Sequence, residues 1–411
     1  MTKFDEFRSG WLVILACAIG VGVGLTGLPF YTFGVFINPL EDAFGWRRSS
    51  IAAGLMVLNA GTLFLSPLLG MVMDRVGVKA IAVPSLIGLA IGMLALSYSG
   101  GSIIHFYAAW MLVAVLGSGT TPLTWTRAVT ASFNEMRGLA LGLTLMGTGL
   151  ASMFGPRLVQ AAIGAGGWEA GFRAMAIFVL LVAVPLAFFG LKSKGSASKQ
   201  TPDATPAIGL DFGEALKRPA FWLIFVGIFF VILGQSSATV HFVPLMTGRG
   251  VEAADATQMM VALGLSVIVG RVLVGLALDR FHAPHVARAC LLLPVLSLLV
   301  LIFTSTGNFG LLSAILLGLA AGAEVDLLAY LVGRYFGLKS YGKIYGVMLS
   351  AFALGGGLGP VLTGMAYDAA GNYALALYVG VGVFLAGAIL LGMLGKYPSF
   401  DTKAPEEEVL V

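Results

Sequence analysis

Three ionisable residues lie deep within long apolar runs, where a charge is costly. Arg271 lies eight residues before Asp279, and Glu324 and Asp326 lie ten and eight residues before Arg334. A charge at the centre of a membrane-spanning helix costs about 2.5–3.5 kcal/mol, so such groups face a cavity or one another. A guanidinium offers a planar fork to two carboxylate oxygens and stays charged when buried. We therefore predict that Arg271 binds a carboxylate; a permanent ion pair with Asp326 or Glu324 is the alternative.

A carboxyl group beside this arginine could carry a proton. Burial favours the neutral form of a carboxyl, whereas a neighbouring arginine favours the charged form. An anion that competes for Arg271 would therefore release the acid to bind a proton, which couples one proton to one anion as symport. Glu324 and Asp326 are two residues apart, about 200° around a helix, so we expect one of them to face the site. Asp326 shares a face with Tyr330 and is favoured, and a structural hydrogen-bonding role is the alternative.

Other polar and aromatic side chains within apolar runs are candidates to line the same cavity. Such groups also bind neighbouring helices or lie at the membrane interface, which makes each a weaker candidate than Arg271. The imidazole of His241 could titrate near neutral pH, although a satisfied histidine near the end of a span is the simpler interpretation. The substrate-binding set that we predict beside Arg271 comprises Tyr31, Asn59, Thr121, Gln235 and Tyr330, with Trp125, His241 and Tyr367 as further candidates.

The composition of the chain indicates a membrane protein. Hydrophobic residues make up 58% of the 411 residues and charged residues only 11%, whereas soluble domains carry roughly 25% charged residues. The mean hydropathy is +0.95. The 56 glycines suit the close approach of helices in lipid. The net charge of +4 arises mostly in loops beside apolar runs, which favours membrane topology over nucleic-acid binding.

Twelve apolar runs are near or above the length that crosses a bilayer. We predict an all-α membrane protein with two six-helix bundles, residues 1–191 and 219–396, joined by a polar linker at 192–218 and followed by a cytoplasmic tail at 397–411. The predicted spans are 11–37, 50–73, 79–99, 103–126, 138–164, 171–191, 219–246, 256–279, 286–305, 309–334, 342–367 and 374–396.

Two landmarks recur at almost the same period along the chain. Asp74-Arg75 and Asp279-Arg280, each preceded by a glycine four residues before the aspartate, are 205 positions apart, and the Gly-Pro pairs at 155–156 and 359–360 are 204 apart. A duplicated, membrane-embedded unit is typical of a secondary transporter. An acidic side chain can cap a helix N-terminus across two halves and hold them closed. We therefore predict gating roles for these four charged residues; topology anchoring is the alternative for the arginines.

The distribution of basic residues predicts the orientation. If both termini lie in the cytoplasm, 18 of the 24 Lys and Arg residues lie on that side. Only Arg47, Arg48, Arg157, Arg173 and Arg249 lie on or near the outer side, and Arg271 lies within a span. This asymmetry is a strong positive-inside signal. It places the repeated aspartate–arginine pairs at the cytoplasmic face.

At this point the chain resembles the major facilitator superfamily. Gly70-Met-Val-Met-Asp74-Arg75-Val-Gly77-Val-Lys79 is similar to that superfamily's loop between helices 2 and 3, and the resemblance covers the whole chain. A narrower resemblance is to the monocarboxylate porter group, including bacterial oxalate/formate-type relatives. It rests on Ser9-Gly10-Trp11, on the stretch from Phe44 to Ser49, and on Phe133-x-x-x-Arg137-Gly138-x-Ala140-x-Gly142-x-x-x-x-Gly147-x-Gly149.

The resemblance implies that Arg271, followed by Gly275, stands where the group keeps a substrate-facing arginine. Two departures limit what it implies about proton coupling. Animal members of the group hold an aspartate one turn before that arginine, where this chain has Val267, and a lysine after the proline of helix 1, where Pro29 is followed here by Phe30. The proton-coupling scheme of those members therefore does not transfer intact.

These features predict a secondary transporter that takes up a small organic carboxylate, such as lactate or pyruvate, with a proton. We expect a monomer, without metal or cofactor, in a bacterial inner membrane. Anion exchange of the oxalate/formate type and drug/proton efflux are the alternatives within the fold, and a fixed arginine suits an anion better than a lipophilic cation. A membrane-embedded sensor or enzyme is a further alternative. Against it, the sequence shows no Walker motif, no metal-ligand spacing and no serine elbow.

Overall fold

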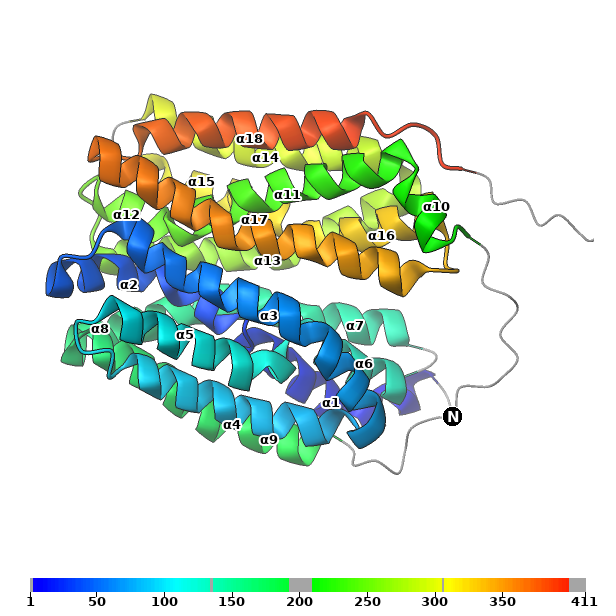
Figure 1. Cartoon of the computed structure of the whole chain (residues 1–411), viewed down its shortest axis with the longest axis horizontal. Coiled ribbons are helices and arrows are strands. Elements are labelled where there is room, and N and C mark those ends of the chain that lie inside the picture. The colour runs from blue at the N-terminus through cyan, green and yellow to red at the C-terminus, as the bar shows by residue number, and fades with distance from the viewer. Residues whose placement is uncertain (1–2, 134–135, 192–208, 305–306, 399–411) are drawn as a thin grey trace, which may run out of the picture.

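The computed structural model describes residues 3–133, 136–191, 209–304 and 307–398, and this part of the chain is a bundle of helices that lie side by side (Figure 1). The single β-bridge in it joins Gly209 to Gly337. The N-terminal half contains α1 (Lys3–Val23), α2 (Leu28–Phe44), α3 (Arg48–Val76), α4 (Val78–Leu96), α5 (Ile103–Gly117), η1 (Ser118–Thr120), α6 (Pro122–Ser132), α7 (Arg137–Leu145), α8 (Gly147–Phe178), η2 (Val179–Ala183) and α9 (Val184–Gly190).

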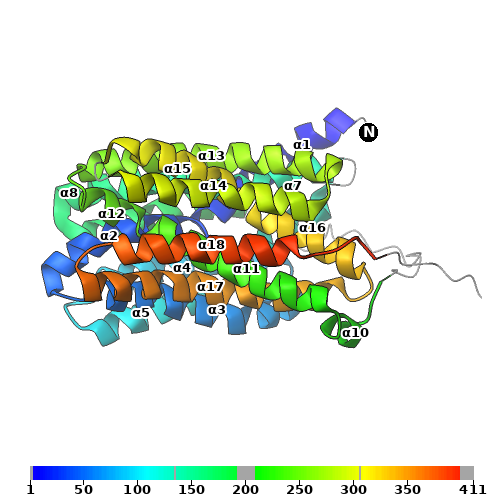
Figure 2. The same cartoon turned by 90° about the horizontal axis from the view of Figure 1, so that it is seen from above.

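The C-terminal half occupies the other side of the bundle, as Figures 1 and 2 show. It contains α10 (Phe212–Leu216), α11 (Pro219–Val240), α12 (Phe242–Thr247), α13 (Ala253–Arg280), α14 (Ala283–Phe303), η3 (Gly307–Phe309), α15 (Gly310–Ala321), α16 (Glu324–Phe336), α17 (Tyr341–Ala370) and α18 (Ala374–Gly392). Most of the predicted linker lies outside the described residues.

The twelve predicted spans are present. The described residues form 11 apolar stretches that are long enough to cross a membrane, and one of them, Arg137–Gly190, is 54 residues long. This stretch contains two of the predicted spans, because Gly166 and Gly167 have non-helical backbone angles within α8. A φ of +77° at Gly167 favours glycine, and this is where the chain turns back. The protein is therefore an all-α, multi-pass membrane protein.

Five of the spans are interrupted rather than continuous. The breaks lie at residues 24–27, 118–121, Met146, His241 and 322–323, in the first, fourth, fifth, seventh and tenth spans. The first two are linked, since the backbone N–H of Leu25 donates to the hydroxyl of Thr120 at 3.3 Å. A proline in the first turn of α2 and another in the first turn of α6 suit a helix that restarts after a break. Broken helices in a bilayer occur where they line a cavity or are buried in protein.

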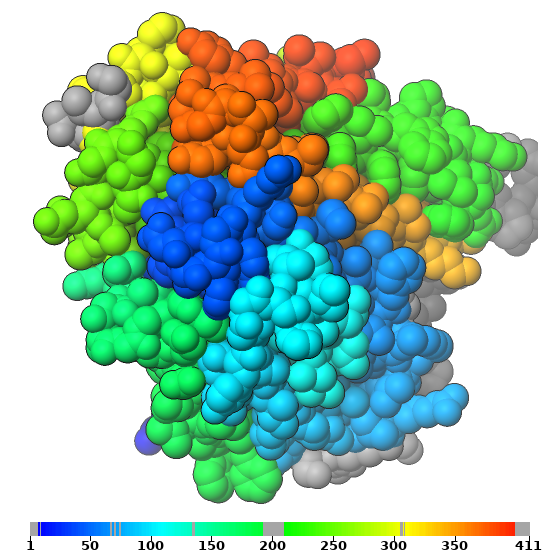
Figure 3. Space-filling model, turned by 60° about the vertical axis from the view of Figure 1, so that its left-hand side comes forward, coloured from blue at the N-terminus to red at the C-terminus, as the bar shows by residue number. Residues whose placement is uncertain are grey.

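The two ends of the bundle differ in how the halves meet. We call the end that carries Lys3, α10 and Gly392 the terminal end, and the opposite end, with the turns at 45–47, 248–252 and 371–373, the distal end (Figure 1). The halves meet along two helix pairs, α3 against α17 and α8 against α13. In a view toward the distal end, the blue α2–α3 region lies directly against the orange α17 (Figure 3).

Glycines mark where the halves touch. An added Cβ at Gly264 of α13 would lie 2.5 Å from the carbonyl oxygen of Gly149, and one at Gly364 would lie 2.6 Å from the backbone nitrogen of Ser49. Towards the terminal end of the same helix pairs, an added Cβ at Gly275 or Gly346 would meet no atom within 4 Å. Close contacts between the halves are therefore described from mid-length to the distal end.

Candidate functional site

Arg271 is positioned by a close contact between α13 and α15. Added Cβ atoms at Gly270, Gly318 and Gly322 would lie 2.2, 2.2 and 2.3 Å from carbonyl oxygens of the facing helix. Only glycine permits the two backbones to approach so closely. The same contact brings the backbone nitrogen of Arg271 to 2.7 Å from the Cβ position of Gly322. Arg271 therefore lies beside the break between α15 and α16.

That break places both intramembrane carboxylates at a helix start. α16 begins at Glu324, and Glu324 and Asp326 both lie in its first turn. The N-terminal end of a helix carries partial positive charge and unpaired N–H groups, which stabilise an acidic side chain nearby. The sequence analysis treated the tenth span as one continuous helix and so missed this contribution.

The ion pair between Arg271 and Asp326 is loose. Nη1 of Arg271 lies 3.4 Å from each carboxylate oxygen of Asp326, longer than the 2.7–2.9 Å typical of a charge-assisted hydrogen bond. The Arg271 side chain is 10% exposed and that of Asp326 31%. Within the described residues, the buried Nε of Arg271 and the buried Oε1 of Glu324 have no hydrogen-bond partner.

Tyr31 from the N-terminal half belongs to the same site. It lies within electrostatic range of both Glu324 and Arg271, and Arg271 lies within range of both Glu324 and Asp326. Tyr345 of α17 lies within electrostatic range of Asp326. The structure thus brings together four residues of the predicted set, one from α2, one from α13 and two from α16, and adds Tyr345 to them.

The described hydrogen bonds of the other predicted binding residues go to groups other than Arg271, Glu324 and Asp326. Gln235 of α11 is buried and donates to the carbonyl of Leu317 at 3.3 Å, while its Oε1 has no partner among the described residues. Asn59 donates to the carbonyl of Leu55 and faces Gly356 across the two halves. Thr121 precedes α6 at the break in the fourth span, where Trp125 donates to the Thr120 carbonyl.

Tyr330 lies nearer to the terminal end. It hydrogen-bonds to Tyr397 and is within electrostatic range of Arg334 and Asp279. It therefore shares a helix with Asp326, as predicted, but its described partners are not those of Arg271. The prediction that Tyr330 binds substrate receives no support from these contacts.

The four predicted gating residues lie at the terminal end, in or next to the last turns of α3 and α13. Arg75, Asp279 and Arg280 are exposed, and the side chain of Asp74 lies outside the described part of the chain. Their gating role remains a prediction. A helix cap between the halves, of the kind predicted for these residues, is present at the distal end.

Asp368 of α17 caps the N-terminus of α3 in the other half. Its carboxylate accepts the backbone N–H groups of Arg48 and Ser49, each at 3.0 Å, and the hydroxyl of Ser49 at 2.5 Å. A second contact nearby joins the amide of Asn38 to the hydroxyl of Thr247 at 2.8 Å. An acidic cap satisfies N–H groups that a helix cannot satisfy itself and favours closure of the halves at this end.

The guanidinium of Arg48 reinforces this contact. It is 8% exposed, donates to Glu41 at 2.9 Å within its own half, and donates to the hydroxyl of Tyr373 in the other half at 2.6 Å. The ring of Tyr367 lies under it, 3.8 Å from the guanidinium carbon. We call Glu41, Arg48, Ser49, Tyr367, Asp368 and Tyr373 the distal clasp. From the sequence, Arg48 was predicted to lie on or near the outer side of the membrane. The feature that could have singled it out is that few basic residues lie on that side.

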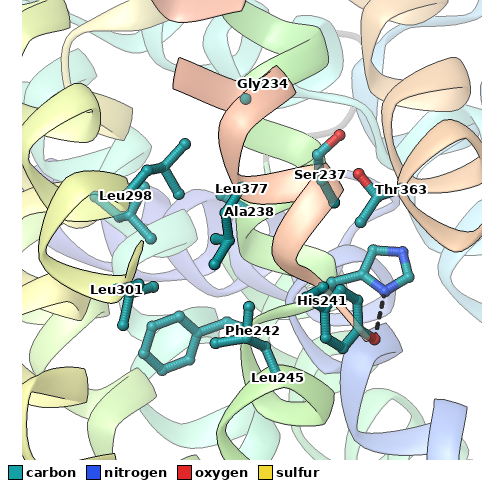
Figure 4. A pocket seen from close by; sticks show the side chains of 14 residues that line it. Gly234, Ser237, Ala238, His241, Phe242, Leu245, Leu298, Leu301, Thr363 and Leu377 are labelled. Carbon is teal, nitrogen blue, oxygen red and sulfur yellow. Dashed lines mark hydrogen bonds between the residues drawn. The ribbon is translucent and has the colours of Figure 1, made fainter. Parts of the chain in front are cut away.

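His241 extends the distal clasp into the C-terminal half. Its Nδ1 lies 3.0 Å from the Tyr373 hydroxyl and its Nε2 lies 2.8 Å from the carbonyl oxygen of Pro360. Burial raises the pKa of the Tyr373 hydroxyl, despite the adjacent Arg48 guanidinium, so this group keeps its proton. Figure 4 shows the His241 ring beside a cavity of about 40 Å³ whose other lining residues are mostly apolar. The candidates His241 and Tyr367 therefore belong to the distal clasp and not to the Arg271 site.

The family model described as Major Facilitator Superfamily matches residues 19–305 and 259–410. The chain belongs to the Major Facilitator Superfamily. It is a membrane transporter of that superfamily and not an enzyme.

Curated relatives match almost the whole chain. A Bacillus subtilis (strain 168) protein named uncharacterized MFS-type transporter YcxA is 23% identical, over 97% of this chain and 98% of that protein. The Bos taurus protein named monocarboxylate transporter 13 is 25% identical, over 98% of this chain and 93% of that protein. The predicted resemblance to monocarboxylate porters is therefore confirmed.

A solved structure shares the fold. A bacterial homologue of the human lysosomal transporter Spinster, described as inward-facing and occupied, superposes with a TM-score of 0.67 over 94% of this chain and 92% of that one. The two sequences are 19% identical. This likeness confirms the all-α superfamily architecture predicted from the sequence.

Proposed function

We propose that this transporter carries a small organic monocarboxylate together with a proton by alternating access. The observation that carries the proposal is the pair of unsatisfied groups beside a loose ion pair. Arg271 has a free buried Nε and Glu324 a free buried Oε1, and Arg271 is held only loosely by Asp326. A carboxylate would satisfy the donor, and a proton would convert the Glu324 oxygen into a group that tolerates burial.

We assign the two acids different roles within this mechanism. Asp326 lies against Arg271 and serves as its counter-ion when the site is empty. Glu324 makes no described ion pair with Arg271 and serves as the proton carrier, whereas the sequence analysis favoured Asp326 for this role. With both acids charged the cluster carries one net negative charge, so an anion is repelled until a proton is bound. This order of binding would give symport.

The contacts between the halves support the transport cycle. The distal clasp is closed while the glycines of α13 and α17 near the terminal end make no close contact. With the termini in the cytoplasm, as the basic residues predict, this state would open to the cytoplasm. Relatives named monocarboxylate transporter 13 and monocarboxylate transporter 10 support a monocarboxylate as cargo.

The test is uptake by the purified chain in proteoliposomes. Labelled lactate, pyruvate, formate and oxalate are supplied with and without an inward proton gradient. We expect a monocarboxylate to accumulate only with the gradient, and Arg271→Ala to abolish that uptake. If uptake does not depend on the proton gradient but is stimulated by anion inside the liposomes, the transport mechanism is anion exchange and not symport. Undiminished uptake by Arg271→Ala would remove the carboxylate anchor.

A further inference from the structure

The hydrogen bonds of His241 in the closed distal clasp suit a neutral imidazole. The carbonyl oxygen of Pro360 can only accept, so Nε2 of His241 carries a hydrogen. In the neutral imidazole Nδ1 then carries none, and the Tyr373 hydroxyl, which accepts from Nη1 of Arg48, donates its own hydrogen to Nδ1. The chain of donors runs from Arg48 in one half, through Tyr373, to a neutral imidazole in the other.

A second proton on His241 would disturb this chain. Nδ1 would become a donor, and the Tyr373 hydroxyl would then face two cationic donors, one from Arg48 and one from His241. The adjoining cavity offers no carboxylate to compensate, because its lining residues are apolar groups such as Leu298 and Leu301 and a few hydroxyls such as Thr363. An uncompensated buried charge is strongly unfavourable. The closed clasp therefore requires His241 to stay neutral.

The charged and titratable groups around His241 come from several elements. Arg48 of α3 and Asp368 of α17 both lie within its electrostatic range. Tyr373, before α18, contacts it directly and in turn lies near Glu41 of α2 and Tyr367 of α17. Arg48 and Glu41 belong to the N-terminal half and would move away from His241 when the distal end opens. Opening would also admit water to the imidazole.

We propose that His241 is a proton-operated release for the distal clasp, so that acid on the distal side opens the transporter towards that side. Protonation of His241 shifts the equilibrium between the clasp-closed and clasp-open states. The proton binds to His241 in the open state. This site is separate from Glu324 and Asp326, and it concerns the gate and not the coupled proton. The distal clasp is reached by solvent, since Glu41, Tyr367 and Asp368 also line an open groove of about 830 Å³ at the surface.

The expected size of the effect follows from linkage. A histidine that titrates near pH 6.5 when hydrated, and stays neutral when the clasp is closed, shifts the equilibrium by up to tenfold per pH unit below that value. Between pH 7.5 and pH 5.5 the ratio of open to closed states should therefore rise about tenfold. Above pH 7.5 the ratio should be nearly constant.

The test measures the distance between the halves without substrate, so its outcome is independent of the proposed function. Cys17 and Cys290 are replaced by alanine, and spin labels are attached to cysteines at the exposed positions Ala43 and Ala370 at the distal end. Double electron–electron resonance then gives the distance distribution in nanodiscs from pH 5.5 to 8.5. We expect a longer distance to gain population as the pH falls in the parent chain, and a pH-independent distribution in His241→Gln.

Two further variants decide which group responds. Asp368→Asn should raise the open population at every pH and keep the pH response, because His241 is intact. Tyr373→Phe should weaken the response, because it disconnects His241 from Arg48. A parent chain whose distances ignore pH overturns the proposal. A pH response of the distance that survives in His241→Gln also overturns it, and one that is lost in Asp368→Asn but retained in His241→Gln would assign the response to Asp368. His241→Asn serves as the second neutral replacement if His241→Gln does not elute as a folded monodisperse protein.

Discussion

The carboxylate of Asp368 and the backbone N–H of Ser49 lie 3.0 Å apart although they belong to different halves and are separated by 319 positions in the sequence. The carboxylate also receives the N–H of Arg48, so α17 caps the first turn of α3. The cap and the guanidinium of Arg48 are therefore noncovalent contacts between the two halves that can break when this end opens.

Replacing Asp368 by asparagine should shift the protein towards the distal-open state. The variant keeps one acceptor oxygen but loses the charge of the cap, and a negative charge near a helix N-terminus is worth about 0.3–1 kcal/mol, which corresponds to a roughly two- to fivefold change in the equilibrium. The readout is the labelling rate of a cysteine at Thr247, at the distal interface, in a chain without Cys17 and Cys290. Asp255→Asn in the first turn of α13 is the matched control and should leave the rate unchanged. Equal rates in Asp368→Asn and the parent would contradict the role of the cap.

Much of the architecture could be predicted because it depends on local sequence. Apolar length gave the twelve spans, the 205-residue period gave two halves, and the cost of a buried charge singled out Arg271, Glu324 and Asp326. Those three residues do lie together, because α13 and α15 touch through Gly318 and Gly322. The prediction thus located the charge cluster without knowing the contact that assembles it.

The distal clasp could not be predicted from the sequence in the same way. Asp368 and Ser49 meet only because α3 packs along α17. No local sequence pattern around either residue predicts a contact with a residue 319 positions away. The break at Gly322 and Ala323 was also missed, since apolar residues predominate on both sides of it and together predict one span. Tertiary packing decides both features, and it also decides which acid pairs with Arg271.

Replacing Glu324 by glutamine should separate anion exchange from proton-driven uptake. The amide is neutral at every pH and so imitates the proton-bound state of the site. A gradient of one pH unit drives about tenfold accumulation in a one-to-one symporter, and the variant should show none, while exchange of labelled for unlabelled anion continues. Counterflow and gradient-driven uptake in the same proteoliposomes give both values. If Glu324→Gln still accumulates the anion, Glu324 is not the proton carrier and another group binds the coupled proton.

Replacing Asp326 by asparagine should have a different effect. Asp326 competes with the substrate for Arg271, and removing its charge should strengthen binding of the anion. The loose 3.4 Å contact is of the order of 0.5–1.5 kcal/mol, so KM should fall by about two- to tenfold. Proton-driven accumulation should persist because Glu324 is intact, but at a lower level, because with Glu324 charged the cluster has no net charge and repels the anion less. If accumulation is lost in Asp326→Asn and kept in Glu324→Gln, the two acids have the opposite roles.

Replacing Gly322 by alanine should damage the Arg271 site through the backbone. The added Cβ would lie 2.3 Å from the carbonyl oxygen of Val267 and 2.7 Å from the nitrogen of Arg271, so α13 and α15 must separate. Overpacking of this kind costs about 1–3 kcal/mol, and the separation also moves Arg271 away from Glu324 and Asp326. We expect a lower melting temperature in detergent together with a higher KM for the anion.

Gly275→Ala, on the same helix as Arg271, is the control for this substitution. An added Cβ there meets no atom within 4 Å, and alanine in place of glycine within a helix is favourable by roughly 0.5–1 kcal/mol. Its melting temperature should therefore equal or exceed that of the parent, and its KM should be unchanged because the α13–α15 contact is intact. If both alanine variants are equally destabilised, the effect comes from losing glycine in α13 and α15 generally. In that case the close contact at Gly322 does not position Arg271.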